Sequence, residues 1–485
     1  MARVLLFADV PETYKPKAGF ALKTMLSAFF RYDDIRIVNK LAAIPEESDA
    51  IRLYYGTDAR RKDDRFDLRI QMAANAPAFF EGRKARKAED VITLNSPETN
   101  LPLLFGDAET AGETPAEGYL PWDVVASAFY FLSDWEAWLP KRPADMHGRL
   151  PYSSTLQAKL NLADRPIVNE YAALIIGCIT STKNVDIKPK MIGGHGFAAC
   201  ITHDFDRIKK RYRGTYVREF FEIPFLNPHG FTREERVRRF RKSVADLLQP
   251  GDGYERSILG MFALEEELGI KPTVLVKSIL EKHKNDAADY LSYPFFNTIL
   301  ERVGELRGEI GLHASYEAGY NEPLYHQEIR QLEARVGQKI RAHRFHYLRY
   351  RHERLPRLLS AAGLFCDSSV GWAERAGFRA GFTHPYFLFD LERNAASPVL
   401  EIPLLMMEMQ LLQKMQLSPQ QALEHACSQA DIVRRYGGVL CWDFHHHALD
   451  DAEAEGAGFL FEQALRYLHH QNPRYLTLRE VYEHI

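Results

Sequence analysis

From residue 198 onward, short apolar runs alternate with longer amphipathic segments, and this alternation constrains the fold more than any other feature of the chain. Seven runs have the length and composition of buried strands: 198–202, 272–278, 309–313, 339–347, 364–368, 399–403 and 439–444. Helical patterns lie between them: 234–248, 254–269, 323–337 and 418–438. Repeated βα units of this kind predict a parallel sheet covered by helices, either a barrel or a doubly wound sheet.

Polar groups at the ends of the predicted strands favour the barrel. In chain order these groups are His203, Asp204, Asp206, His313, Arg344, His346, Asp367, Asp443, His445, His446 and His447. The carboxyl ends of the strands in a parallel barrel meet at one mouth, where catalytic groups collect. We therefore expect these side chains to form one site.

The first 190 residues do not show this regular alternation and instead mix short apolar runs with loop signals. The chain of 485 residues is longer than one core of about 100 to 200 residues requires, so two domains are expected. Loop signals occur at 95–102 and 106–118, and a helical pattern covers 123–139. We predict a smaller α/β domain over residues 1–190, followed by the barrel over residues 191–485.

Charge and hydropathy exclude several classes of protein. The 62 basic and 65 acidic residues leave a formal charge of -3 without a long block of one sign, which argues against a nucleic-acid partner. The apolar run at 172–178 is far shorter than the about 20 residues that span a bilayer. The apolar start before Asp9 is too short for a signal peptide, so a cytoplasmic protein is expected. Five scattered cysteines indicate reduced thiols, and nothing predicts the oligomeric state.

Two segments carry the residue types of a hydrolytic metal site. Asp204 and Asp206 are one residue apart, so one carboxylate could bind a divalent metal while the other takes a proton from the metal-bound water. His313 and Glu317 are four residues apart and would share a face if the chain turns helical after the strand. The alternative is that Glu317 is a solvated loop charge.

Two later segments could complete such a site. Strand alternation places Arg344 and His346 on one face, where the arginine could keep a catalytic carboxylate ionised; the alternative is a surface ion pair. One of His445, His446 and His447 could act as general acid or as a metal ligand. Three histidines in a row can also be a loop feature without such a role.

Taken in order, these segments resemble the motifs of the polysaccharide deacetylases, or NodB-like carbohydrate esterases. The resembling segments are 202–206, 309–316, 344–350, 367–391, 401–408 and 440–447. Further segments resemble a bacterial subgroup with an extra N-terminal domain: 127–139, 145–150 and 165–171. The resemblance implies a deformed (β/α) barrel and a divalent metal, usually zinc (Zn2+), that activates water against the N-acetyl group of a sugar.

The resemblance also implies roles for individual residues. Asp204 would be the general base, Asp206 and His313 would bind the metal, and Arg344 would orient the base. Glu317 stands where the family has a second histidine, so either its carboxylate or a water molecule would take the third ligand position.

The terminal motif departs from the subgroup as well. Asp443 follows Trp442 where the subgroup has a histidine, so the task of protonating the leaving amine would fall to His445 or a neighbour.

The leading hypothesis is thus a metal-dependent carbohydrate deacetylase that acts on an N-acetylated sugar or saccharide precursor. The departures at Glu317 and Asp443 motivate a second hypothesis, a degenerate carbohydrate-binding protein on the same scaffold. A third is an amide or ester hydrolase that uses the same metal chemistry on another substrate.

Overall fold

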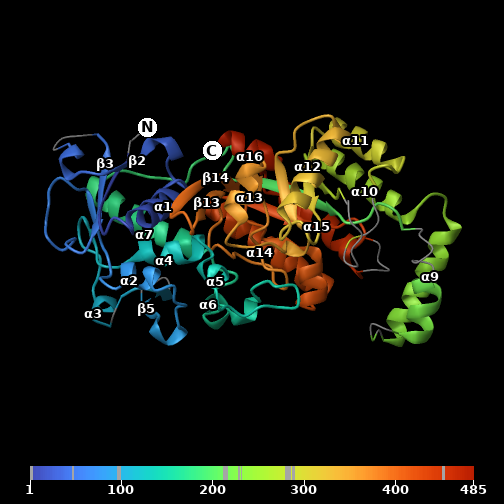
Figure 1. The fold of residues 1–485 in the computed structure, drawn as a ribbon, viewed down its shortest axis with the longest axis horizontal. Helices are drawn as coiled ribbons and strands as arrows, with labels where there is room; N and C mark the ends of the chain where they lie inside the picture. The colour runs from blue at the N-terminus through green and yellow to red at the C-terminus, as the bar shows by residue number, and fades with distance from the viewer. Residues whose placement is uncertain are drawn as a thin grey trace.

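The computed structural model describes residues 4–45, 49–95, 100–106, 108–210, 217–227, 230, 232–278, 286, 290–449 and 454–485. The molecule is elongated, with the N-terminal part at one end and the curled sheet of the C-terminal part beside it (Figure 1). Helix α9 (Arg233–Leu248) projects at the far end. No helix among these residues is long and apolar enough to cross a bilayer.

The N-terminal part contains a parallel sheet of five strands in the order β2-β1-β3-β4-β7. Its strands are β1 Val4–Asp9, β2 Ile35–Val38, β3 Ile51–Gly56, β4 Leu68–Gln71 and β7 Tyr119–Leu120. Its helices are α1 Lys15–Leu26, α2 Ala76–Glu81, α3 Ala108–Ala111, α4 Val124–Leu132, α5 Trp135–Trp138, α6 Leu156–Lys159 and α7 Ile167–Lys183. Every residue of the central strand β3 is buried, as expected for a parallel strand covered on both faces.

Three local predictions for this part are wrong. The loop predicted over 106–118 contains the short helix α3. The helix predicted over 123–139 is interrupted, because Asp134 adopts a left-handed conformation (φ 47°) and pairs with Arg379 at 2.6 Å. The segment 95–102 is not only a loop, since its ends belong to an antiparallel pair, β5 Ile92–Asn95 and β6 Asn100–Leu103. Residues 96–99 lie outside the described part of the chain.

The C-terminal part contains a sheet of ten strands in the order β13-β14-β12-β11-β10-β9-β8-β16-β15, with β17 paired to β8. The strands are β8 Ala198–Phe205, β9 Thr273–Val276, β10 Glu309–Ala314, β11 Ala342–Phe345, β12 Cys366–Asp367, β13 Tyr386–Asp390, β14 Ala395–Glu401, β15 Met406–Met407, β16 Val439–Asp443 and β17 Arg474–Tyr475. All recorded pairs are parallel except β13 with β14. Each of the seven strands predicted from the sequence overlaps a strand of this sheet.

Helical segments connect these strands, and the four helices predicted there are present within about two residues at each end. The α-helices are α9 Arg233–Leu248, α10 Gly253–Leu268, α11 Phe295–Glu305, α12 Glu322–Val336, α13 Leu355–Ala361, α14 Pro419–Tyr436, α15 Ala457–His470 and α16 Leu478–His484. Two wider π-type segments are η5 Arg218–Leu226 and η7 Gln410–Lys414. Short 3₁₀ turns are η1 Tyr32–Asp34, η2 Leu41–Ala43, η3 Ala88–Asp90, η4 Tyr152–Ser154 and η6 His346–Leu348.

The chain itself links the two edges of the parallel sheet. β14 pairs with β12 near one edge, and β15, which begins after residues 402–405, pairs with β16 at the other. The backbone N–H of Ile402 donates to the carbonyl oxygen of Asp367, and the backbone N–H of Leu405 donates to the carbonyl oxygen of Cys441. The sheet is therefore curled, and the carboxyl ends of its parallel strands face one mouth.

The two parts share a hydrophobic core. The ring of Phe389 in β13 lies 5.0 Å from that of Phe20 in α1 and 5.1 Å from that of Phe129 in α4. Helix α1 contacts both β13 and β14. The boundary predicted near residue 190 is thus not a break in the packing.

Candidate functional site

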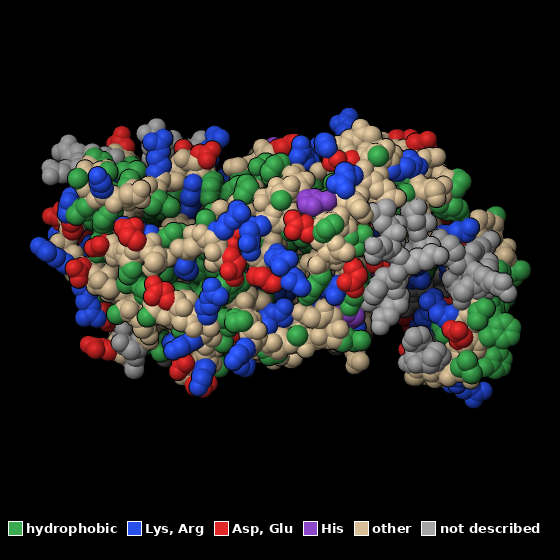
Figure 2. All heavy atoms as spheres, viewed as in Figure 1, with side chains coloured by type: hydrophobic (Ala, Val, Ile, Leu, Met, Phe, Trp, Pro, Cys, Tyr) green, Lys and Arg blue, Asp and Glu red, His purple; other side chains and the backbone are tan. Residues whose placement is uncertain are grey.

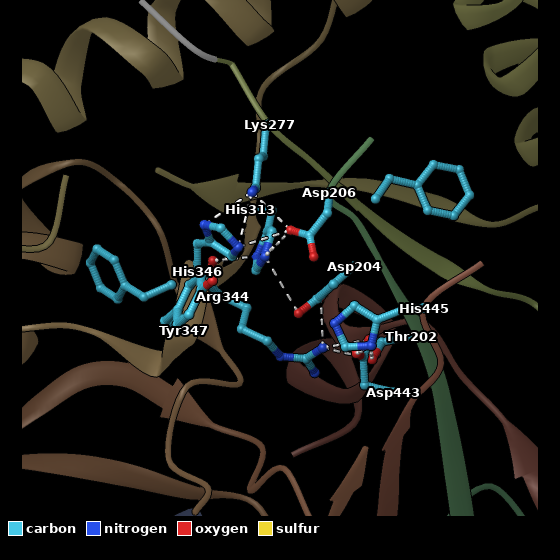
Figure 3. Close-up of polar contacts among 12 residues, drawn as sticks. Thr202, Asp204, Asp206, Lys277, His313, Arg344, His346, Tyr347, Asp443 and His445 are labelled. Carbon is cyan, nitrogen blue, oxygen red and sulfur yellow. Dashed lines mark hydrogen bonds and ion pairs between the residues drawn. The ribbon is translucent and has the colours of Figure 1, made fainter. Parts of the chain in front are cut away.

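Polar side chains from four strand ends meet at the mouth of the curled sheet (Figure 3). Asp204 lies near the end of β8, and Asp206 follows that strand. His313 in β10 is in register with Arg344 in β11, and Asp443 in β16 is in register with Thr202. The predicted convergence is therefore present for these strand-end groups, although not for every group that the prediction included.

Asp206, His313 and His346 form a group suited to a divalent ion. Each offers one ligand atom, and these atoms all lie within 4.8 Å of one another. Asp206 Oδ1 is 3.1 Å from His346 Nε2 and 3.5 Å from His313 Nε2. One carboxylate and two imidazoles are a ligand set that zinc and other divalent transition metals accept.

The two imidazole rings are held by contacts on their far sides. His313 Nδ1 lies 3.2 Å from the carbonyl oxygen of Arg344, and His346 Nδ1 lies 2.8 Å from Asp286 Oδ1. Asp286 in turn accepts the backbone N–H of Tyr316 at 3.0 Å. Such contacts at Nδ1 orient a metal-binding histidine and leave Nε2 for the ion.

One of the ligand atoms is buried and lacks a hydrogen bond. Within the described part of the chain, no group donates a hydrogen bond of good geometry to His313 Nε2, whereas Asp206 Oδ1 has an ammonium group 2.8 Å away. Buried polar atoms of this kind call for a partner. The residues present thus fit a bound divalent ion.

The ammonium group of Lys277 shares this site. Its Nζ atom lies 2.8 Å from Asp206 Oδ1, 3.0 Å from each ring nitrogen of His346 and 3.3 Å from Asp286 Oδ1, and its side chain is 1% exposed. Burial opposes the ionisation of Asp206, but Lys277 and His346 hold its pKa well below the usual range. The sequence-based hypotheses did not include Lys277, because the strand predicted over 272–278 contains this residue, whereas β9 ends at Val276 and Lys277 directly follows it.

Arg344 connects the metal-type group to a second cluster of acids. Its Nη1 atom lies 2.9 Å from Asp204 Oδ1, 2.8 Å from Asp443 Oδ1 and 2.9 Å from Thr202 Oγ1, and the side chain is fully buried. Against the effect of burial, Arg344 and then His313 lower the pKa of Asp204. Burial and the charge of Asp204 raise the pKa of Asp443 to about 7.

His445 faces this second cluster and is held by Glu408. Its Nδ1 atom lies 3.0 Å from Glu408 Oε1 and 3.4 Å from Asp443 Oδ2. Burial acts to lower the pKa of His445, yet Glu408 and Asp443 raise it well above the ordinary value. The raised pKa favours the protonated form of His445, which is the form that can donate a proton.

Glu317, predicted as the third metal ligand, does not lie in this group. Its carboxylate is 42% exposed and contacts Arg349 Nη1 at 3.4 Å. The prediction required a helix directly after β10, but residues 316–320 form turns and α12 begins only at Glu322. His346, and not Glu317, lies beside Asp206 and His313.

The remaining histidines point elsewhere. His203 lies 2.6 Å from Glu265 Oε1 of α10, because strand alternation turns it away from the face that carries Thr202 and Asp204. His446 packs on Phe205 and Tyr254. Burial lowers the pKa values of His446 and His447.

The N-terminal part contributes to the rim of the site. His147 Nδ1 lies 2.9 Å from the hydroxyl of Tyr316, and its ring centroid is 4.8 Å from that of Tyr347. Arg149 donates to the carbonyl oxygen of Tyr347. Tyr347 has a φ of 60°, which is unusual for a bulky residue and positions the turn that carries His346.

Comparisons with known proteins give limited similarity. Residues 6–184 match a family model described as a family of unknown function, DUF7033. No curated protein matches the chain.

Several solved structures are similar in shape. A Mycobacterium smegmatis protein described as a polysaccharide deacetylase is 15% identical over 60% of this chain and 90% of its own, with a TM-score of 0.39. The PuuE allantoinase is 12% identical over 62% of this chain and 97% of its own, with a TM-score of 0.39. A GH57 branching enzyme from Thermococcus kodakaraensis is 13% identical over 59% of this chain and 71% of its own, with a TM-score of 0.29. Similarity at this level is a coarse likeness of shape.

Proposed function

We propose that this chain is a metal-dependent hydrolase that removes the acetyl group from an N-acetylated sugar or saccharide precursor, on a deformed (β/α) barrel of the polysaccharide deacetylase type. One observation carries the proposal: Asp206, His313 and His346 converge beside Asp204, a carboxylate that Arg344 keeps ionised. The order of the motifs along the sequence supports the substrate class.

Asp206, His313 and His346 would hold the ion, and zinc fits their donor set. When bound there, a divalent ion lowers the pKa of water and polarises the amide carbonyl. Asp204 Oδ2 lies 3.6 Å from His313 Nε2, so the carboxylate borders the ligand group.

Asp204 acts as the base in this mechanism. Its Oδ1 atom is occupied by Arg344, which keeps the carboxylate ionised and fixed, and Oδ2 faces the ligand group. The carboxylate accepts the proton of the water that attacks the amide carbon.

His445 acts as the acid. The C–N bond of the amide breaks, the proton of His445 passes to the leaving nitrogen, and the products are acetate and a free amine. Glu408 and Asp443 keep this proton available by raising the pKa of His445.

Tyr347 is the aromatic group best placed to contact a sugar. It is 39% exposed at the rim of the site. Trp372 and Phe378, two other aromatic residues of the C-terminal part, are buried in the core. A ring at the rim is suited to stacking on the apolar face of a sugar.

Lys277 favours a second candidate function, a carbohydrate-binding protein without catalysis. Its ammonium group already neutralises Asp206 and contacts His346, the same atoms that a metal would use. In a non-catalytic protein of this kind, the ammonium group of Lys277 would always occupy the position of the metal ion.

Metal analysis combined with an acetate-release assay distinguishes the two functions. Purified chain is equilibrated with zinc, desalted and measured for bound metal, then incubated with N-acetylglucosamine oligomers and a nucleotide-linked N-acetylhexosamine. Stoichiometric zinc and acetate release that Asp204→Asn abolishes support the hydrolase. A protein that binds these sugars but holds no zinc and releases no acetate is the non-catalytic form.

A further inference from the structure

The segment η5 together with α9, residues 217–227 and 232–248, forms an arm that projects from the body (Figure 1). The arm holds nine of the 17 exposed large apolar side chains among the described residues. They are Val217, Phe221, Phe225, Leu226, Val237, Phe240, Val244, Leu247 and Leu248. Phe225, Leu226 and Leu248 are 77%, 75% and 82% exposed, and Figure 2 shows apolar side chains gathered over this part.

Helix α9 turns polar residues inward and its apolar face to solvent, the opposite of the usual arrangement. Its buried residues are Arg239 and Ser243, and Arg239 pairs with Glu219 of η5 at 3.2 Å. Val237, Phe240, Val244 and Leu247 follow the three- and four-residue spacing of a single helical stripe, and this stripe faces water. A surface helix of a globular protein normally turns that stripe to the core, and an exposed apolar stripe of this kind is typical of an interaction surface.

The charge of α9 identifies the kind of partner. The helix carries six basic and three acidic residues, whereas the whole chain carries a formal charge of -3. Arg233 and Arg241 are exposed along the stripe. A second copy of the chain docked on the same stripe would place these arginines against one another, and like charges across an interface oppose association.

We propose that the arm attaches the protein to the surface of an anionic lipid bilayer. The apolar stripe and the phenylalanines of η5 enter the boundary between headgroups and acyl chains, while the arginines beside them meet the negative headgroups. This attachment is peripheral. It does not depend on the proposed hydrolysis, because the arm contributes none of the site residues named above.

Sedimentation of the full chain with lipid vesicles tests the proposal. The vesicles contain either phosphatidylcholine alone or phosphatidylcholine mixed with phosphatidylglycerol. We expect binding to the anionic vesicles, weakened by added salt, and much less binding to the neutral ones.

Two sets of substitutions separate the apolar and the charged contributions. The combined variant Phe221→Ser, Phe225→Ser, Leu226→Ser and the charge reversal Arg233→Glu, Arg241→Glu should each weaken binding by about tenfold or more. Met191→Ser is the matched control, because Met191 is 61% exposed outside the arm, and it should leave binding unchanged. Circular dichroism verifies the fold of each variant.

Three results would overturn the proposal. The first is no binding of the wild-type chain to anionic vesicles, and the second is equal binding by the arm variants and the wild type. The third is a dimer in sedimentation-velocity experiments without vesicle binding, which the combined serine variant dissociates, because the stripe would then be an interface between two copies.

Discussion

The Nζ atom of Lys277 lies 2.8 Å from Oδ1 of Asp206, the same oxygen that faces the imidazoles of His313 and His346. A divalent ion at this point and the ammonium group of Lys277 would repel each other strongly, since both are buried and share one carboxylate. Metal loading should therefore require Lys277 to move.

We expect Lys277→Met to bind zinc at least about tenfold more tightly than the wild type, because the competing charge is gone. Competition with a chromogenic chelator measures the affinity. Lys271→Met is the control, since Lys271 pairs with Glu480 away from the site. Unchanged or weaker zinc binding by Lys277→Met would show that the lysine does not compete with the ion.

The third ligand is tested by comparing His346 with Glu317. His346→Ala should reduce zinc affinity by a factor of about 100 or more, as should His313→Ala, because each removes a ligand of the group. Glu317→Gln should bind zinc like the wild type, since its carboxylate points to Arg349. Isothermal titration calorimetry measures these affinities. If Glu317→Gln weakened zinc binding and His346→Ala did not, Glu317 would be the third ligand.

Glu408 should set the alkaline limit of activity. A general acid must be protonated, so activity falls as pH rises through the pKa of His445. Glu408 raises that pKa, and Glu408→Gln should therefore move the alkaline limb of the kcat/KM profile to lower pH. An unmoved limb would mean that another group is the acid.

Asp123 should make folding stability depend on pH. Burial raises its pKa from 3.8 to about 7, so the stability that its neutral form provides is present at low pH and is lost as pH rises through 7. Between the ordinary pKa of 3.8 and the raised pKa of about 7, the free energy of unfolding falls by about 4 kcal/mol.

Asp123→Asn cannot ionise, so its free energy of unfolding should improve relative to the wild type between pH 4 and pH 8. The variant gives up the contact from the backbone N–H of Ala73, which adds a constant cost of about 1 kcal/mol. Urea unfolding across this pH range measures both effects. A constant difference between the two proteins would place the Asp123 pKa in its ordinary range.

The shared core should make the two parts of the chain unfold together. Phe389→Ala leaves a cavity between β13 and helices α1 and α4, and we expect it to lower the free energy of unfolding by about 3 to 5 kcal/mol in a single transition. Phe459→Ala is the control, since that side chain is 43% exposed. Two separate calorimetric transitions, of which Phe389→Ala shifts only one, would show independent domains.

Much of the C-terminal sheet could be predicted from the sequence, because its strands are short apolar runs between clear helical patterns. The edge strand β13, the two-residue strands β15 and β17 and the break at Asp134 could not. Their pairing depends on chain segments far away, such as Arg379 for Asp134 and β16 for β15.

The alternation of strands and helices after residue 198, and the placement of Asp204, Asp206, His313 and Arg344 at strand ends, follow from periodicity and burial, which are local properties of the chain. Which groups meet at the mouth depends on the folded chain. It brought in His346 and Lys277 and left Glu317 at the surface, because a turn after β10 and a left-handed residue after His346 set the directions of these side chains. Spacing along the chain specifies no such directions outside regular helices and strands.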